Sequence, residues 1–185
     1  RRRAELDAAL KGSSPVENPR RLRITLAGGP KDHGPGEHDY PLWLKRWSAL
    51  LATDPSVALQ TAEGWQSARQ FEDSDVVIVY SNNPGWDAGK GEELDRYIAR
   101  GGGLVPIHYA VDGHQAVDAL AGRIGLAWQG GKSAFRHGPL DVDFSGSKHP
   151  ITRGLGRLRL VDESYWDLAG DPASVVARAD KVRDL

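Results

Sequence analysis

The fold of this chain is decided by the stretch Gly-Gly-Gly-Leu-Val-Pro-Ile-His-Tyr-Ala-Val-Asp-Gly, residues 101–113. A helical pattern ends on the three glycines, which can leave a helix through positive φ values that other residues avoid. Residues 104–107 are short and apolar on both faces, as strands of a covered parallel sheet are. Because ligands bind beyond the carboxyl ends of such strands, the stretch predicts a site at His108.

Upstream of this stretch, strands and helices alternate. Strands are predicted at 22–27, 57–61 and 75–80, and helices at 42–52 and 92–100. This alternation favours a doubly wound, mainly parallel α/β sheet. Its loops at 28–40, 81–87 and 108–114 should then open on one edge of the sheet. In the first helix, the spacing predicts an inward-facing side made of Trp43, Trp47, Leu50 and Leu51.

Beyond residue 113 the pattern changes. We expect a helix over 116–124, a polar loop over 128–138, and two half-exposed strands, 140–144 and 157–162, that form a small antiparallel extension. A short β-like run is expected at 174–179. Residues 1–21 form a predicted N-terminal arm, and residues 22–185 one domain.

Composition narrows the function classes. The net charge of −1 gives no basic field for nucleic acid. The sequence also contains no run of about 18 apolar residues, which a membrane-spanning helix would need. A small-molecule partner is expected, and a homo-oligomer stays open. The chain has no cysteine, which excludes disulfides and thiolate nucleophiles, and no methionine, which predicts a mature or trimmed product. Periplasmic or secreted and cytoplasmic locations are both compatible with these counts.

Histidines are the main candidates for chemistry. Of six in the chain, four fall in loops or strand ends at the predicted edge: His33, His38, His108 and His137. Imidazole serves as general acid or base near neutral pH and as a ligand of zinc. The alternative is a histidine that only hydrogen-bonds a neighbouring loop. A divalent metal such as zinc would need these four ligands to converge from separate loops, because no short paired spacing is present.

Several motifs together resemble the ThuA-like (trehalose utilisation) family over roughly residues 22–180. They are Gly-Gly-Pro-Lys-Asp-His at 28–33, Gly-Glu-His-Asp-Tyr at 36–40, the stretch 101–108, Phe-Arg-His at 135–137, His-Pro-Ile-Thr at 149–152 and Asp-Glu-Ser-Tyr-Trp at 162–166. The resemblance implies a flavodoxin-like α/β fold similar to class I glutamine amidotransferases. Where that fold carries its cysteine nucleophile this chain has His108, so glutamine hydrolysis by that route is excluded. The family also implies a further strand, turn and helix after residue 185, and site residues there.

The resemblance implies carbohydrate utilisation, with trehalose-type disaccharides or keto-glycosides as the substrate class. Our first hypothesis is acid/base chemistry on such a glycoside, by a hydrolase, lyase or isomerase. The candidate catalytic residues are His108, Asp112 and Glu163. The candidate substrate-binding residues are His33, His38, Asp39, Tyr40, Asn82, Tyr109, Arg136 and His137. The alternatives are a metal-dependent hydrolase, a non-catalytic sugar-binding or assembly subunit that serves an oxidoreductase, and a purely structural relic of the fold.

Overall fold

The computed structural model describes residues 20–83, 86–146, 148–152 and 154–175 of the 185-residue chain. These residues divide into two compact units. The larger unit holds 20–131 with 169–171, and the smaller unit holds 132–168 with 172–175. The predicted N-terminal arm lies almost wholly outside the described residues, and a single domain over 22–185 stays a prediction.

The larger unit is built on a four-stranded parallel sheet in the order β2-β1-β3-β4. Its strands are β1 (Leu22–Gly28), β2 (Val57–Glu63), β3 (Val76–Tyr80) and β4 (Gly103–Pro106). Each neighbouring pair runs parallel, so the chain must cross over between strands. This confirms the predicted doubly wound α/β fold, with the strand order of flavodoxin-like proteins.

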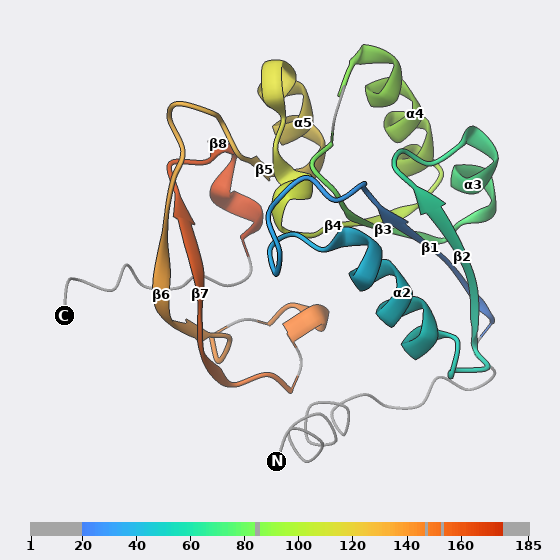
Figure 1. Cartoon of the computed structure of the whole chain (residues 1–185), viewed down its shortest axis with the longest axis horizontal. Helices are drawn as coiled ribbons and strands as arrows, with labels where there is room; N and C mark the ends of the chain where they lie inside the picture. Colours follow the sequence, from blue (N-terminus) through green and yellow to red (C-terminus); the bar gives the residue numbers. More distant parts are fainter. Residues whose placement is uncertain (1–19, 84–85, 147, 153, 176–185) are drawn as a thin grey trace. The chain divides into compact units, whose positions relative to one another are not determined.

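Helices cover both faces of this sheet. α2 (Tyr40–Leu51) lies on one face, and α3 (Ala68–Asp73) and α4 (Ala88–Ala99) lie on the other (Figure 1). After β4 the chain makes two short 3-10 turns, His108–Val111 and His114–Ala116, and enters α5 (Val117–Ile124). The unit closes with a short antiparallel pair, β5 (Leu126–Ala127) and β8 (Ala169–Gly170). Among the described residues, none of the helices has the length and apolar character that a membrane crossing requires.

The predicted inward face of α2 is wrong in part. Trp47 and Leu50 are 44% and 57% exposed, whereas Tyr40 is fully buried. Tyr40 and Leu44 pack against Gly28 of β1, so the contact face is rotated by about one position, roughly 100°, from the one that the tryptophans suggested. The helix therefore meets the sheet through its first turn, where Tyr40 enters the core.

The end of α4 agrees only in part with the prediction that three glycines leave the helix through positive φ values. Gly101 leaves the helix with a φ of 90°, but the two glycines after it do not need positive φ. The hydroxyl of buried Tyr97 donates to the carbonyl oxygen of Gly103 at 2.7 Å. The last turn of α4 is thereby tied to the first residue of β4. This contact fixes where β4 begins and, after its four residues, where it leads the chain towards His108.

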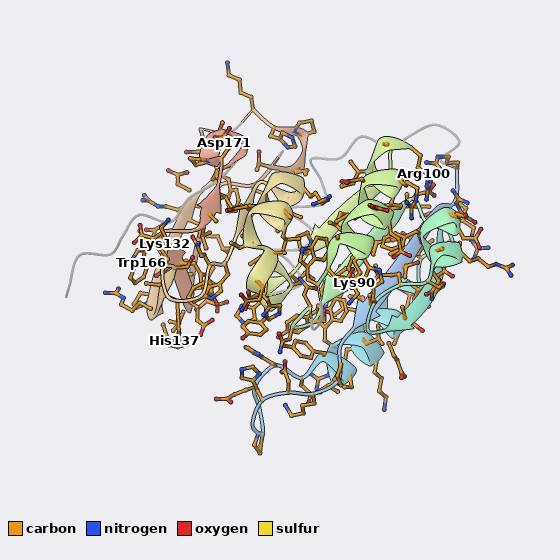
Figure 2. All side chains as sticks on the ribbon, turned by 90° about the horizontal axis from the view of Figure 1, so that it is seen from above. Lys90, Arg100, Lys132, His137, Trp166 and Asp171 are labelled. Carbon is orange, nitrogen blue, oxygen red and sulfur yellow. The ribbon has the colours of Figure 1, made fainter. Side chains whose placement is uncertain are left out.

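The smaller unit contains one long hairpin, made of β6 (Ala134–Asp143) and β7 (Arg157–Trp166) in antiparallel register. The antiparallel extension is confirmed, but the loop predicted over 128–138 is wrong in its second half, which belongs to β6. Gly138 and Pro139 concealed the strand, since a two-stranded ribbon has only edge strands and tolerates both. Figure 2 shows His137 and Trp166 on the two strands of this hairpin.

The remaining predicted run, 174–179, falls largely outside the described residues. Its start belongs instead to a 3-10 turn, Pro172–Ser174, and another such turn, Pro150–Thr152, lies between β6 and β7.

Candidate functional site

Three loops meet beyond the carboxyl ends of β1, β3 and β4. His38, in the loop after β1, contacts His108, which directly follows β4. Asn82, in the loop after β3, hydrogen-bonds the carboxylate of Asp32, and its carbonyl oxygen lies 2.7 Å from Nε2 of His114. These contacts confirm the prediction that the three loops open on one edge of the sheet, as the topology requires.

Packing and backbone hydrogen bonds hold the loops together at their bases. Gly29 lies so close to Ser81 that a Cβ at this glycine would be 2.9 Å from the Cβ of Ser81. The side-chain amide of Asn83 donates to the carbonyl oxygen of Ala110. The backbone N–H of Gly29 donates to the carbonyl of Tyr80 at 3.1 Å. The polar tips of the loops are therefore carried on a rigid base.

Asp32 accepts several hydrogen bonds at this edge. Nδ1 of His33 lies 2.6 Å from its Oδ1, and the hydroxyl of Tyr40 donates to its Oδ2 at 3.2 Å. Partial burial raises the pKa of Asp32, but the hydrogen bonds from His33, Asn82 and Tyr40 outweigh it and leave the pKa below its ordinary value. Asp32 is therefore a carboxylate at neutral pH.

His38 and His108 form a direct imidazole pair. Their Nε2 atoms are 2.9 Å apart, and Nδ1 of His38 lies 3.3 Å from the hydroxyl oxygen of Tyr40. Tyr40 gives its only proton to Asp32, so its oxygen accepts the Nδ1 proton of His38. A hydrogen-bonded chain thus runs from the carboxylate of Asp32 through Tyr40 and His38 to His108.

The backbone at this edge is strained. Among the described residues, five that are not glycine have positive φ, and four of them lie in these loops: His38, Asn83, His108 and His114. The values for His38 and His108 are 38° and 53°. Such conformations cost of order 1–3 kcal/mol each and persist where the surroundings impose them, often at functional sites. The strain therefore coincides with the imidazole pair.

Aromatic rings surround the imidazoles. The ring of Tyr109 lies 5.7 Å from His33 and 5.3 Å from His38, and the ring of His33 lies 3.8 Å from that of His38. Burial raises the pKa of the Tyr109 hydroxyl above its ordinary value, and the charges of Asp112 and Asp32 add to the effect. Burial likewise raises the pKa of Tyr40, with a further contribution from Asp32. Both hydroxyls therefore stay protonated and can donate at neutral pH.

Two predicted site carboxylates have local structural partners. Asp39 is the N-cap of α2 and accepts from the backbone N–H of Leu42 at 3.0 Å. Asp112 is only 7% exposed and accepts the backbone N–H of His114 at 2.8 Å. Their assignment to substrate binding and catalysis stays a prediction. Tyr40, also predicted to bind substrate, is fully buried and contacts Asp32 and His38, and its part in substrate binding likewise stays a prediction.

The other predicted residues belong to the hairpin of the smaller unit. His137 on β6 pairs in register with Glu163 on β7, and Arg136 pairs with Ser164. The hydroxyl of Tyr165 donates to the carboxylate of Glu163. Arg136, His137 and Glu163 thus share one ribbon, and their part in a site stays a prediction.

One group of side chains in the described residues is arranged to hold a metal ion. Asp32, His33 and His38 each offer a ligand atom, and these atoms all lie within 4.8 Å of one another. The group includes two of the four histidines proposed as ligands from the sequence, His33 and His38, and adds a carboxylate. Asp32, which stands directly beside His33 in the first family-like motif, supplies this carboxylate.

The fold and the site define a flavodoxin-like α/β protein with a histidine-rich cluster at the carboxyl edge of its sheet. The profile of the ThuA family, described as trehalose utilisation, matches residues 43–184. The chain belongs to the ThuA family, as its motifs suggested.

Two solved structures share the fold. A ThuA-like protein from Bacteroides uniformis superposes with a TM-score of 0.62 at 16% sequence identity, covering 87% of this chain and 66% of that one. A ThuA-like protein from Parabacteroides merdae gives a TM-score of 0.60 at 16% identity, covering 86% of this chain and 68% of that one. The chain thus spans about two thirds of their length. No curated protein matches it.

Proposed function

We propose that this protein acts on a trehalose-type disaccharide or a keto-glycoside by acid/base chemistry centred on His108. The family description, trehalose utilisation, supports the substrate class. The observation that carries the chemistry is the contact of 2.9 Å between the Nε2 atoms of His38 and His108, connected through Tyr40 to the ionised Asp32. A carboxylate at one end of such a chain fixes the tautomer and orientation of the imidazoles at the other.

The proposal gives each described residue of the edge a role. His108 exchanges a proton with the substrate, and His38 shares the charge. Asp32 and Tyr40 position His38. His33, Tyr109 and Asn82 contact the sugar, because they come from the three loops that meet at this edge. Asp112 and Glu163 remain candidate assisting groups, and Arg136 and His137 candidate contacts to the substrate.

The proton transfer is common to hydrolysis, elimination and isomerisation. Each of these reactions moves a proton at a hydroxyl, glycosidic oxygen or carbon next to a carbonyl, and each needs a group with a pKa near the working pH. A keto-glycoside is the more reactive of the two substrates, since its carbonyl acidifies the neighbouring C–H bond. The proposal therefore predicts faster turnover of the keto form than of trehalose.

The test compares wild type with His108→Ala and His149→Ala on trehalose and its keto derivative, followed by NMR of the sugar. His149 lies in a turn of the smaller unit, so its variant controls for the loss of an imidazole elsewhere. We expect His108→Ala to lose on the order of 10²–10⁴-fold in kcat and His149→Ala to keep wild-type rates. Full turnover in His108→Ala would overturn the proposal.

The same experiment separates the non-catalytic alternative. Calorimetric titration of the same sugars measures binding independently of turnover. A wild-type protein that binds a glycoside but converts none, alone and with a sugar oxidoreductase added, would be a binding subunit and not an enzyme.

A further inference from the structure

A second property of the edge concerns the loop between β1 and α2. Asp32, His33 and His38 come from this one loop, and their exposed side-chain fractions are 22%, 36% and 19%. The three groups are thus held near one another and remain open to solvent. We propose that they bind one divalent transition-metal cation, with zinc as the reference ion, through Oδ1 of Asp32 and Nδ1 of both histidines.

The distances suit a cation. Oδ1 of Asp32 lies 4.0 Å from Nδ1 of His38, and two ligands at about 2.0–2.1 Å from a tetrahedral zinc ion are roughly 3.3 Å apart, so these two atoms would approach by less than about 1 Å. Oδ1 of Asp32 lies 2.6 Å from Nδ1 of His33, with one proton between them. Replacing that proton by a cation requires these two atoms to separate by less than about 1 Å, a side-chain adjustment.

A second layer of contacts already orients the ligands. The free oxygen of Asp32 accepts from Tyr40 at 3.2 Å, and Asn82 also donates to this carboxylate. The second nitrogen of His38 faces His108. Metal-bound carboxylates and imidazoles usually have such outer partners, which fix the orientation and tautomer of the ligand. The cluster therefore shows both the ligand set and its support.

The site would keep an open coordination position. Three protein ligands leave room for a water or a substrate oxygen on a tetrahedral ion, as in catalytic zinc sites. Beside the cluster, Oδ1 of Asn82 is buried without a hydrogen-bond partner among the described residues. Such an acceptor could receive a hydrogen bond from a metal-bound water. A set of two nitrogens and one oxygen favours zinc, cobalt or nickel over calcium or magnesium.

The inference concerns the site of the proposed function but does not depend on the reaction. A cation on Nδ1 of His38 would replace the proton that this atom donates to Tyr40, so the metal-bound state and the proton chain through Tyr40 are alternative states of the site. A cation there would hold and polarise a substrate oxygen next to His108, whether or not His108 transfers a proton. His108 is outside the ligand set, so loss of the metal and loss of the acid/base group can be produced by different substitutions.

The test is binding of Zn²⁺ to the metal-free full chain, measured by calorimetry and by metal analysis after dialysis, with the visible spectrum of bound Co²⁺ as a second readout. We expect one equivalent in wild type. Asp32→Asn, His33→Ala and His38→Ala should each weaken binding by at least tenfold. His149→Ala should bind as wild type does, and His108→Ala should still bind one equivalent even where turnover is lost.

Thermal unfolding of each variant without metal shows whether it is folded, and Asp32→Asn keeps the size of the side chain. Wild type that binds no Zn²⁺, or binds it equally well after all three substitutions, would overturn the metal site and leave the proposed acid/base function untouched. Metal binding together with normal turnover in His108→Ala would support the metal site and overturn the proposed acid/base function.

Discussion

At the scale of single residues, Tyr40 is the group on which the site depends most. Its ring is fully buried at the start of α2, and its hydroxyl touches both Asp32 and His38. One side chain thus couples the core to the carboxylate and to the imidazole pair. Without it, Asp32 would keep the donors His33 and Asn82 but lose its link to His38.

Tyr40→Phe tests this coupling, since it keeps the ring and removes the hydroxyl. The pKa of Asp32 should rise towards its ordinary value, because one donor to the carboxylate is lost. A carboxyl whose pKa is lower in the folded state than in the unfolded state stabilises the fold at pH values above its unfolded pKa. This stabilisation is lost as the pH falls through the folded pKa. The variant should therefore lose about 1 kcal/mol at pH 7 and begin acid unfolding at higher pH, as urea titrations at several pH values would measure.

A second residue-scale prediction concerns Asp75, which joins β3 to β1. It accepts from the backbone N–H and the guanidinium of Arg23, both at 2.9 Å. The hydrogen bonds from Arg23 lower its pKa well below the ordinary value. Asp75→Asn should cost about 1–3 kcal/mol at pH 7. The difference from wild type should be complete above the ordinary aspartate pKa of about 4 and should shrink as pH falls below it, because the unfolded chain then takes up a proton that the native carboxylate resists. A difference independent of pH would contradict the assignment.

At the scale of elements, the N-terminus of α2 separates two roles of Asp39. As N-cap, Asp39 can be replaced by Ser, which also accepts from a helix N–H, whereas Ala cannot. We expect Asp39→Ala to lose about 1 kcal/mol of stability and Asp39→Ser to lose little. If both variants bind a glycoside as wild type does, Asp39 is only a cap. A loss of binding in both would support the sequence prediction that it contacts substrate.

The elements that the sequence predicted well are those with strong periodicity or clear ends. Residues 75–80 are apolar between polar neighbours, and β3 was predicted to within one residue. α3 was missed, because its six residues are too few to show a helical period. It is stabilised by a capping box between Ser67 and Gln70, a signal that the sequence does contain. The hairpin was shortened, because Gly138 and Pro139 interrupt an otherwise alternating pattern.

In the candidate site, too, some features could be predicted from the sequence and others could not. Topology predicted that His33, His38 and His108 would meet, since the ends of parallel strands share an edge. It could not predict that Tyr40 points inward to Asp32, because this depends on the rotation of α2 about its axis. It also could not show that Asp32, seven positions before the N-cap Asp39, faces the histidines. Side-chain direction within an irregular loop is set by tertiary packing and leaves no periodic trace.

At the scale of the whole molecule, the two units differ in how their strands are protected. β1 and β3 are central strands, with helices over both faces of the sheet. The β6–β7 hairpin is a two-stranded ribbon, and Phe135, Leu158 and Val161 are more than half exposed on it. An isolated two-stranded ribbon is marginally stable.

Native-state hydrogen exchange should therefore divide the chain. Amide protons of β1 and β3 should exchange only through global unfolding, and those of β6 and β7 through a smaller opening with a lower free energy. Exchange can be followed by mass spectrometry of peptides across denaturant concentrations. Equal protection of both units at all concentrations would show that they unfold as one cooperative body.

The positive φ values of His38 and His108 have a consequence for anyone who wishes to engineer this scaffold. Glycine is the residue that such backbone favours, so the two positions where an imidazole is most useful are also positions where it is conformationally expensive. Selecting variants of this sequence for stability alone would tend to replace the two histidines by glycine and keep the loop conformations. A substitution that raises stability at either position is therefore expected to remove an imidazole on which the proposed chemistry depends.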